Sequence, residues 1–318
     1  MKRRDTAMGP GAEFDAIREM LRRWGPRAQG IGDDAALLDV PAGEHLAVST
    51  DSTVEDVHFR RGWLTPHEIA YRATVAALSD LAAMAASPLG LVSALAIPRD
   101  WRSQLPEIAE GIGEAAAQFA TPIVGGNVTG GALLTITVTV LGSVSRALPR
   151  SGVAAGDTLY VTGRLGASGA ALAAFEKGVR PSPAHRARFA RPTPRIREAR
   201  WLAAHGARAA IDISDGLLAE LSHLAAASQV WIALDTASVP LFEEVSIADA
   251  LKSGEEYELL VAGSGLDVAH FEKELGVPLT AVATARALAP GEQPGVGGTA
   301  PTKGRRVAPK SGHDHFSS

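Results

Sequence analysis

The chain has 318 residues, of which 46% are hydrophobic and 21% charged, a balance typical of soluble globular proteins with room for two domains. Its formal net charge of −4 excludes a basic field for nucleic acid, and its lack of cysteine excludes disulfides, thiolate metal sites and cysteine nucleophiles. The basic first residues lead into no apolar signal core, and no uncharged apolar run approaches the roughly 18 residues of a membrane-spanning helix. We therefore expect a cytoplasmic protein without membrane attachment.

The N-terminal half is predicted to alternate helices and strands. Its clearest strand covers residues 134–141, where Ile136 and Val138 alternate with threonines and so give one apolar and one hydroxylated face. A short buried strand over residues 46–50 would leave Asp51 at its end. Helical spacing and apolar runs predict the other elements, which are helices over 14–24, 67–86 and 105–119, a strand over 89–97 and a strand running into a glycine turn over 123–127.

The C-terminal half also mixes helices and strands. The chain becomes polar and glycine-containing over residues 146–157, so we place a boundary there, with domains at 1–147 and 148–318. Residues 180–195 read as a proline- and arginine-rich connection, and 287–310 are too rich in glycine and proline to predict regular structure. Two mixed α/β (α+β) domains fit this alternation better than one doubly wound sheet. The regular elements expected here are strands over 158–162, 230–234 and 256–261, a strand-to-helix turn over 211–216, and helices over 166–176 and 217–227.

Aspartates stand beside glycine, serine or threonine in four separate segments. Magnesium prefers hard oxygen ligands, and neighbouring glycines let the backbone approach phosphate, so converging loops of this kind could hold a nucleotide triphosphate with several ions. Taken singly, such segments form turns and helix caps more often than ligands, and for Asp215 alone the cap is favoured. Asp80 differs, because its neighbours are almost wholly apolar and a carboxylate there is expected to be paired or metal-bound. The segments are Gly32-Asp33-Asp34, Ser49-Thr50-Asp51-Ser52, Ser79-Asp80 and Asp212-Ile213-Ser214-Asp215-Gly216.

The usual phosphate-binding and hydrolase motifs are missing from the sequence. There is no G-x-x-x-x-G-K-[ST] loop and no G-x-G-x-x-G after a strand. Gly111 and Gly113 fall inside a predicted helix, where packing is a better explanation for them than a phosphate cradle. His67-Glu68 lacks the second histidine of a zinc protease, and no G-x-S-x-G elbow is present.

The aspartate segments, taken in order with their neighbours, resemble those of thiamine-monophosphate kinases. The resemblance extends from residue 13 to residue 316, nearly the whole chain. Any one piece could arise by chance, whereas the ordered set is specific. The matching segments are Glu13-Phe14, Gly30-Ile31-Gly32-Asp33-Asp34-Ala35-Ala36, Ser49-Thr50-Asp51-Ser52-Thr53-Val54-Glu55-Asp56-Val57-His58-Phe59, Leu78-Ser79-Asp80-Leu81-Ala82-Ala83-Met84-Ala85, Ile211-Asp212-Ile213-Ser214-Asp215-Gly216-Leu217, Leu251-Lys252-Ser253-Gly254-Glu255-Glu256-Tyr257-Glu258-Leu259-Leu260 and Gly312-His313-Asp314-His315-Phe316.

This resemblance implies the fold shared with aminoimidazole ribonucleotide synthetase. An N-terminal α/β domain would bind ATP and magnesium and build a barrel with a partner subunit, which implies a homodimer. An α+β C-terminal domain would complete the nucleotide and substrate site. The implied reaction is the phosphorylation of thiamine monophosphate to thiamine diphosphate by ATP with several Mg²⁺ ions.

The resemblance also implies roles for single residues. Matching positions imply magnesium ligands at Asp33, Ser49, Thr50, Asp51, Asp80, Asn127, Asp212 and Asp215, ATP contacts at Gly126, Asn127, Arg146 and Ser214, and substrate contacts at His58, Glu255 and Phe316. Three of these residues have an alternative structural interpretation. His58 could be a half-buried residue at a strand end, Arg146 a linker charge, and Phe316 an aromatic plug of the core.

Departures from the family pattern keep a second reading open. Asn127 stands where the family usually has aspartate, Ala109 and Glu110 where an aromatic residue is expected, and Glu256 where aspartate is usual. A degenerate member that binds nucleotide or thiamine phosphate without turnover, or a kinase for another small molecule, is therefore the alternative. Selenophosphate synthetases and hydrogenase-maturation dehydratases need a cysteine or selenocysteine that this chain lacks. Residues 49–54 do not match the loop expected of an aminoimidazole ribonucleotide synthetase.

Overall fold

A computed structural model of the chain describes residues 12–31 and 34–298, which form two compact units. The first unit is made of Met1–Leu81 and Ala86–Ser145, and the second of Ala82–Ala85 and Arg146–Ser318. In the described residues, the first unit carries a four-stranded sheet and the second a six-stranded sheet. The mixed α/β, two-domain fold class is confirmed. No helix in this part of the chain is long and apolar enough to cross a membrane.

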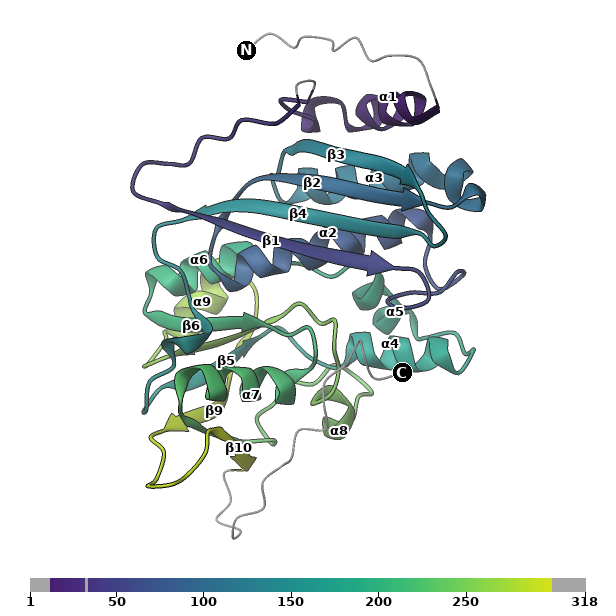
Figure 1. Cartoon of the computed structure of the whole chain (residues 1–318). Coiled ribbons are helices and arrows are strands. Elements are labelled where there is room, and N and C mark those ends of the chain that lie inside the picture. The colour runs from purple at the N-terminus through teal and green to yellow at the C-terminus, as the bar shows by residue number, and fades with distance from the viewer. Residues whose placement is uncertain (1–11, 32–33, 299–318) are drawn as a thin grey trace. The chain divides into compact units, whose positions relative to one another are not determined.

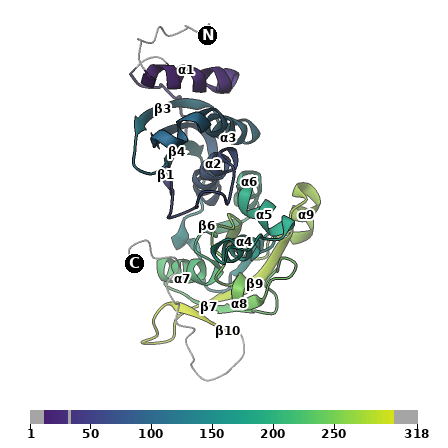
Figure 2. The same ribbon diagram turned by 90° about the vertical axis from the view of Figure 1, so that its right-hand side faces the viewer.

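The first unit is an open sheet with helices on one face (Figures 1 and 2). Its strand order is β1-β4-β2-β3, in which β4 is antiparallel to both neighbours and β2 and β3 are parallel. Helices α2 and α3 cover the same side of this sheet. The elements are α1 (Ala12–Trp24), η1 (Gly25–Arg27), β1 (His45–Val54), α2 (Pro66–Ala83), β2 (Ser87–Ile97), η2 (Arg99–Gln104), α3 (Leu105–Gln118), β3 (Ile123–Gly130) and β4 (Thr135–Val144).

The alternation predicted for β4 is confirmed. Ile136, Val138 and Val140 are fully buried, because successive side chains of a strand point to opposite faces and these three lie on the covered one. On the other face, hydroxyls pair across strands: Thr50 Oγ1 lies 2.9 Å from Thr139 Oγ1, and Ser52 Oγ 2.8 Å from Thr137 Oγ1. The open face is therefore lined with hydrogen-bonded hydroxyls, which water or another surface can approach.

Strand β1 is longer than the sequence indicated. Asp51 was expected at the strand end, but it lies inside β1 and pairs with Val138 of β4. The expectation was wrong because Thr53 and Val54, both β-branched, continue the ladder opposite Ile136 and Thr135. Asp51 is therefore held on a rigid strand and not on a loop.

Close packing explains Gly111. A Cβ added to it would lie 2.2 Å from the backbone oxygen of His67 and 2.9 Å from the nitrogen of Tyr71. Helices α2 and α3 thus touch backbone to backbone at this point, which only glycine permits. The expectation that Gly111 serves packing is confirmed.

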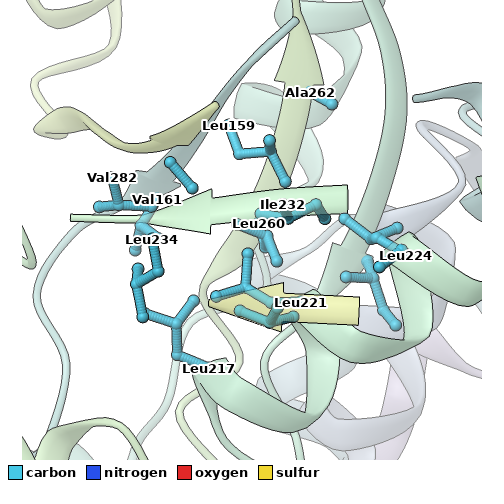
Figure 3. Close-up of a cluster of buried hydrophobic side chains, with 14 of the residues drawn as sticks. Leu159, Val161, Leu217, Leu221, Leu224, Ile232, Leu234, Leu260, Ala262 and Val282 are labelled. Carbon is cyan, nitrogen blue, oxygen red and sulfur yellow. The ribbon is translucent and has the colours of Figure 1, made fainter. Parts of the chain in front are cut away.

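The second unit holds a six-stranded sheet of order β10-β7-β9-β5-β8-β6. Leu217, Leu221 and Leu224 of α7 point from the helix into the apolar core against Ile232 and Leu260 of the sheet (Figure 3). The elements are η3 (Arg150–Gly152), β5 (Thr158–Thr162), α4 (Ala167–Glu176), α5 (Pro183–Ala190), α6 (Ile196–Ala204), β6 (Ala207–Asp212), α7 (Leu217–Ser228), β7 (Trp231–Leu234), α8 (Ile247–Ala250), β8 (Leu259–Gly263), α9 (Val268–Leu275), β9 (Leu279–Arg286) and β10 (Gly295–Gly298).

Two segments expected to lack regular structure contain it. Helix α5 lies in the supposed connection over 180–195, begins at the cap Ser182, whose hydroxyl accepts the amide of His185, and buries Phe189. Strand β10 lies in the glycine-rich stretch and pairs with β7. A Cβ at Gly297 would lie 2.7 Å from the Trp231 ring, so glycine here permits strand pairing beside a large side chain.

Candidate functional site

In the first unit, Ser49 and Asp80 meet although 31 residues separate them. The Ser49 hydroxyl on β1 donates to Asp80 Oδ2 on α2 at 2.5 Å. Both side chains are half-buried, and Ser79 and Leu81 beside Asp80 are almost fully buried. The expectation that Asp80 is paired or metal-bound is met by this hydroxyl. The hydrogen bond between β1 and α2 fixes the position of this carboxylate.

The predicted ligands on β1 divide between two faces of the sheet. Asp51 follows Ser49 by two positions, so its side chain lies on the same face as Ser49. Thr50 lies on the opposite face, where its hydroxyl pairs with Thr139. The structure therefore groups Ser49, Asp51 and Asp80 on one face and directs the Thr50 side chain away from them.

His58 follows β1 in a tightly bonded loop. The Val54 amide donates to His58 Nδ1 at 3.0 Å, and the Val54 carbonyl accepts the His58 amide at 2.9 Å. Because Nδ1 accepts, a neutral His58 carries its proton on Nε2. His58 thus lies close to the end of a strand, as one of its two interpretations expected. Its role in substrate binding stays a prediction.

Glu55 anchors the same loop, and the sequence reasoning missed it. Its carboxylate, 4% exposed, accepts Arg61 Nε at 2.5 Å, Trp101 Nε1 at 3.0 Å and the Leu134 amide at 3.0 Å. The Arg61 guanidinium also lies 4.6 Å from the centroid of the Trp101 ring. Glu55 directly follows β1, which ends at Val54 and so extends beyond the strand predicted over 46–50.

Gly126 and Asn127 lie on β3. A Cβ at Gly126 would be 2.3 Å from the Ser93 carbonyl oxygen, so β2 and β3 approach each other more closely here than a side chain would allow. Asn127 pairs with Ala94 and is exposed. It lies one position further along β3, on the face opposite that of Gly126.

In the second unit, the turn after β6 is held by the segment before β8. The Ser214 carbonyl accepts the Glu255 amide at 2.7 Å, and the Ile213 carbonyl accepts the amides of Glu256 and Tyr257 at 3.1 and 3.0 Å. Glu255 and Tyr257 have positive φ values of 57° and 53°, an uncommon conformation for such residues. Asp212, 5% exposed, ends β6 just before this turn.

Glu220 lies beneath this turn and was not predicted. Its Oε1 accepts the Asp215 amide at 3.0 Å and the Ser214 hydroxyl at 3.4 Å. Burial raises the pKa of the Glu220 carboxyl to about 7, although the hydrogen bond from the Asp215 amide lowers it. An acidic residue in the first turn of a helix was the signal for it, since such residues often reach back to exposed amides.

Glu256 joins the segment before β8 to the start of α4. Its Oε1 accepts the amides of Gly166 and Ser168 at 2.7 and 3.2 Å and the Ser253 hydroxyl at 2.5 Å. Its Oε2 is buried without a hydrogen-bond partner among the described residues. Burial raises the pKa of Glu256, against the Ser253 hydroxyl and the charge of Arg188, which lower it.

We expect Glu256→Gln to change how stability depends on pH. The folded protein holds the Glu256 proton more tightly than the unfolded chain, so the contribution of this group is full below about pH 4.5 and falls as the pH rises through the raised pKa. Glutamine keeps the accepting oxygen but does not ionise, so the free energy of unfolding of the variant should rise relative to that of the wild type as the pH increases from 5 to 8. The free energy of unfolding in urea is measured for both proteins at pH 5 and pH 8. An equal difference between variant and wild type at the two pH values would contradict the prediction.

Glu258 is the centre of a buried charge cluster that the sequence reasoning also missed. The side chain is 1% exposed, and its Oε1 lies 2.5 Å from Arg188 Nη2 and 2.6 Å from Arg195 Nη2. Its Oε2 accepts Arg195 Nε and the Thr162 hydroxyl, each at 2.7 Å. Gly163 has φ 63°, and a Cβ there would lie 2.4 Å from Glu258 Oε1. The cluster ties the residue before β8 to β5, to α5 and to the start of α6.

Arg146 is held at another place in the second unit. Arg146 donates at 3.4 Å to the carbonyls of Ala203 and Ala207, at the end of α6 and the start of β6. This contact agrees with the interpretation of Arg146 as a linker charge with a structural role, and its ATP role stays a prediction. Asp33 and Phe316 lie outside the described residues.

The chemistry of the predicted ligands suits magnesium, although the structure does not bring them into one cluster. Within residues 12–31 and 34–298, no three histidine, aspartate or glutamate side chains lie close enough together to hold a metal ion. The predicted ligands present are carboxylate, hydroxyl and amide oxygens, which are the donors that Mg²⁺ selects while keeping sites for water and phosphate. Asp51 and Asp80 belong to the first unit, and Asp212 and Asp215 to the second.

Two family models match the chain, and both describe AIR synthase related proteins. The N-terminal domain model matches residues 32–144 and the C-terminal domain model residues 154–279. The chain is 36% identical over 272 residues to the thiamine-monophosphate kinase of Escherichia coli (strain K12). This alignment covers 80% of the chain and 82% of that protein.

Two solved structures are similar to the chain over nearly its whole length. The thiamine-monophosphate kinase of Stenotrophomonas maltophilia K279a has a TM-score of 0.79 and 33% sequence identity, and the match covers 91% of this chain and 96% of that one. AaThiL, solved in complex with AMPPCP and TMP, has a TM-score of 0.76 and 28% identity, with 95% of this chain and 96% of that one covered.

Proposed function

Since this chain belongs to the thiamine-monophosphate kinase family of AIR synthase related proteins, we propose that it transfers the terminal phosphate of ATP to thiamine monophosphate and releases thiamine diphosphate and ADP. The observation that carries the proposal is the half-buried Ser49–Asp80 pair on rigid elements of the first unit. This pair lies in two segments of the ordered aspartate series, and it provides an anionic, preorganised position of the kind a metal–nucleotide complex needs.

We assign the metal and ligand roles as the sequence implied them. The magnesium ligands would be Asp33, Ser49, Asp51, Asp80, Asn127, Asp212 and Asp215. Thr50, which the sequence also implied, directs its hydroxyl to the opposite face of the sheet and would join them only through its main-chain oxygen. Bound Mg²⁺ would neutralise the negative charge of the polyphosphate. The ATP contacts would be Gly126, Asn127, Arg146 and Ser214, and the substrate contacts His58, Glu255 and Phe316.

The acceptor chemistry explains why no strong general base is assigned. A phosphate monoester has a second pKa of roughly 6, so at neutral pH the acceptor oxygen is already largely ionised. The protein would therefore act by holding donor and acceptor in line for direct transfer. His58, with a proton on Nε2 when neutral, would orient the substrate and not carry the phosphoryl group.

We further propose that the chain works as a homodimer in the cytoplasm, with the sheet of the first unit built into a barrel with a second copy. In the described residues this sheet is open, and its edge strand β1 exposes Leu46 and Val48, which are 49% and 58% accessible. An unpaired edge with exposed apolar side chains favours pairing with another strand.

The test of function follows two products in one reaction. Purified protein is incubated with ATP, Mg²⁺ and thiamine monophosphate, and ADP and thiamine diphosphate are quantified together. Equal appearance of both products is expected. ADP without thiamine diphosphate would indicate another acceptor. ATP binding without turnover would indicate the degenerate binder, with Asn127→Asp as the variant to restore activity.

A further inference from the structure

Glu220 is almost fully buried, yet its side chain returns to the turn that precedes its own helix. The residue lies in the first turn of α7 and is 2% exposed. Its Oε1 accepts the Asp215 amide at 3.0 Å and the Ser214 hydroxyl at 3.4 Å. Both partners belong to the turn between β6 and α7, so one carboxylate oxygen spans the strand-to-helix junction.

The Asp215 amide needs this acceptor. Gly216 precedes α7 with φ 103° and ψ 151°, so the chain is not helical there and the amide before it has no partner within the helix. An amide that faces the interior is costly to leave without an acceptor. Glu220 supplies that acceptor and at the same time sets the orientation of the peptide that carries Asp215.

The other side of the turn is held by backbone alone. The Ser214 carbonyl accepts the Glu255 amide, and a Cβ on Gly254 would lie 2.6 Å from the same oxygen. The segment before β8 therefore fixes the Ser214 carbonyl, whereas the Ser214 hydroxyl and the Asp215 amide depend on Glu220. Without the Glu220 acceptor, the Ser214 hydroxyl and the Asp215 amide would lose the hydrogen bonds that orient them.

We propose that Glu220 is a positioning residue of the kinase site: through hydrogen-bond acceptance it sets the orientation of Ser214 and Asp215 toward the magnesium–ATP complex, without contacting that complex itself. This inference rests on the proposed function, in which Ser214 contacts ATP and Asp215 is a magnesium ligand. Its distinguishing feature is that an uncharged acceptor of the same shape can replace the carboxylate.

Two variants of similar size separate acceptance from charge. Glu220→Gln keeps an oxygen acceptor, and Glu220→Met keeps the volume but has none. We expect E220Q to bind ATP in the presence of Mg²⁺ within about threefold of the wild type. We expect E220M to bind it at least tenfold more weakly, and to show the same increase in KM for ATP with KM for thiamine monophosphate unchanged.

Asp157 provides a matched control in the same unit. It is 1% exposed and its Oδ2 accepts the Ala154 amide at 2.8 Å, in a turn to which no site residue is assigned. Asp157→Asn and Asp157→Leu should alter stability but leave ATP affinity unchanged. If Asp157→Leu weakened ATP binding as much as E220M, general destabilisation would account for the effect and the proposal would be overturned.

Equilibrium ATP binding keeps this test separate from the test of the reaction. A wild-type protein that makes no thiamine diphosphate refutes the proposed reaction, yet the affinities of E220Q and E220M for Mg²⁺–ATP still decide the role of Glu220. Equal loss in both variants would mean that the charge acts, which overturns the proposal, as would unchanged affinity in E220M. If E220M does not fold, Glu220→Leu takes its place as the variant of similar size without an acceptor, and a tenfold loss in E220Q refutes the proposal in either case.

Discussion

Asp80→Ala is expected to lower kcat for thiamine diphosphate formation by at least about 100-fold, which corresponds to about 2.7 kcal/mol of transition-state stabilisation. Asp80 supplies a carboxylate that the Ser49 hydroxyl orients at 2.5 Å, in a part of the helix whose residues are almost wholly apolar. Removing it deletes a predicted magnesium ligand and leaves the Ser49 hydroxyl without this acceptor. The measurement is the initial rate at saturating ATP over a range of Mg²⁺ concentrations.

Asp56 is the control for this prediction. It is exposed and has φ 67°, a conformation that asparagine also adopts readily, and no role is assigned to it. Asp56→Asn should retain wild-type kcat. Normal turnover in Asp80→Ala would refute the assignment of Asp80 as a magnesium ligand, and an equal loss in both variants would show that the effect is not specific to this site.

Glu258→Ala is expected to destabilise the protein by about 3–5 kcal/mol, the cost of removing one partner from a buried charge cluster. The guanidinium groups of Arg188 and Arg195, only 13% and 14% exposed, both bind this carboxylate. Without it, two positive charges would remain in the interior without their shared carboxylate, although Arg195 keeps an ion pair with Glu198 at 3.6 Å. The Thr162 hydroxyl would also lose its acceptor. The fall in the midpoint of urea unfolding measures the effect.

An exposed ion pair in the same unit sets the scale for that loss. Arg286 Nη1 lies 2.6 Å from Glu292 Oε2, with 49% of the Arg286 side chain accessible. Glu292→Ala should therefore cost less than about 1 kcal/mol, because water and salt screen such pairs. A Glu258→Ala variant that unfolds at the same urea concentration as Glu292→Ala would show that the buried cluster contributes little to stability.

Local pattern alone predicted a large part of the fold. The alternation of Ile136, Val138 and Val140 with threonines indicated a half-covered strand, and β4 has one buried and one hydroxylated face. The helices α2 and α3 and the strand β5 were predicted because each carries its own periodicity or apolar run. Asp80 stood out for a related reason, since a carboxylate in an apolar helix needs a partner.

Segments with weak local patterns were missed because their structure depends on distant partners. Strand β9 lies between β7 and β5 in the sheet, and alanine and threonine there give no distinct apolar run. Strand β10 forms because glycine can lie against Trp231 of a neighbouring strand. Both strands are stabilised by pairing across the sheet, which single-segment reasoning does not detect.

What the sequence by itself determined is the order of the aspartate segments, the mixed α/β class and the family to which they point, because each rests on residue types and short spacings. What only the tertiary structure decided is how those carboxylates are held. Ser49 meets Asp80, and Glu258 meets two arginines from 63 and 70 residues away. Such contacts form between elements far apart in the chain, and their geometry depends on packing of the folded core, which no local spacing encodes.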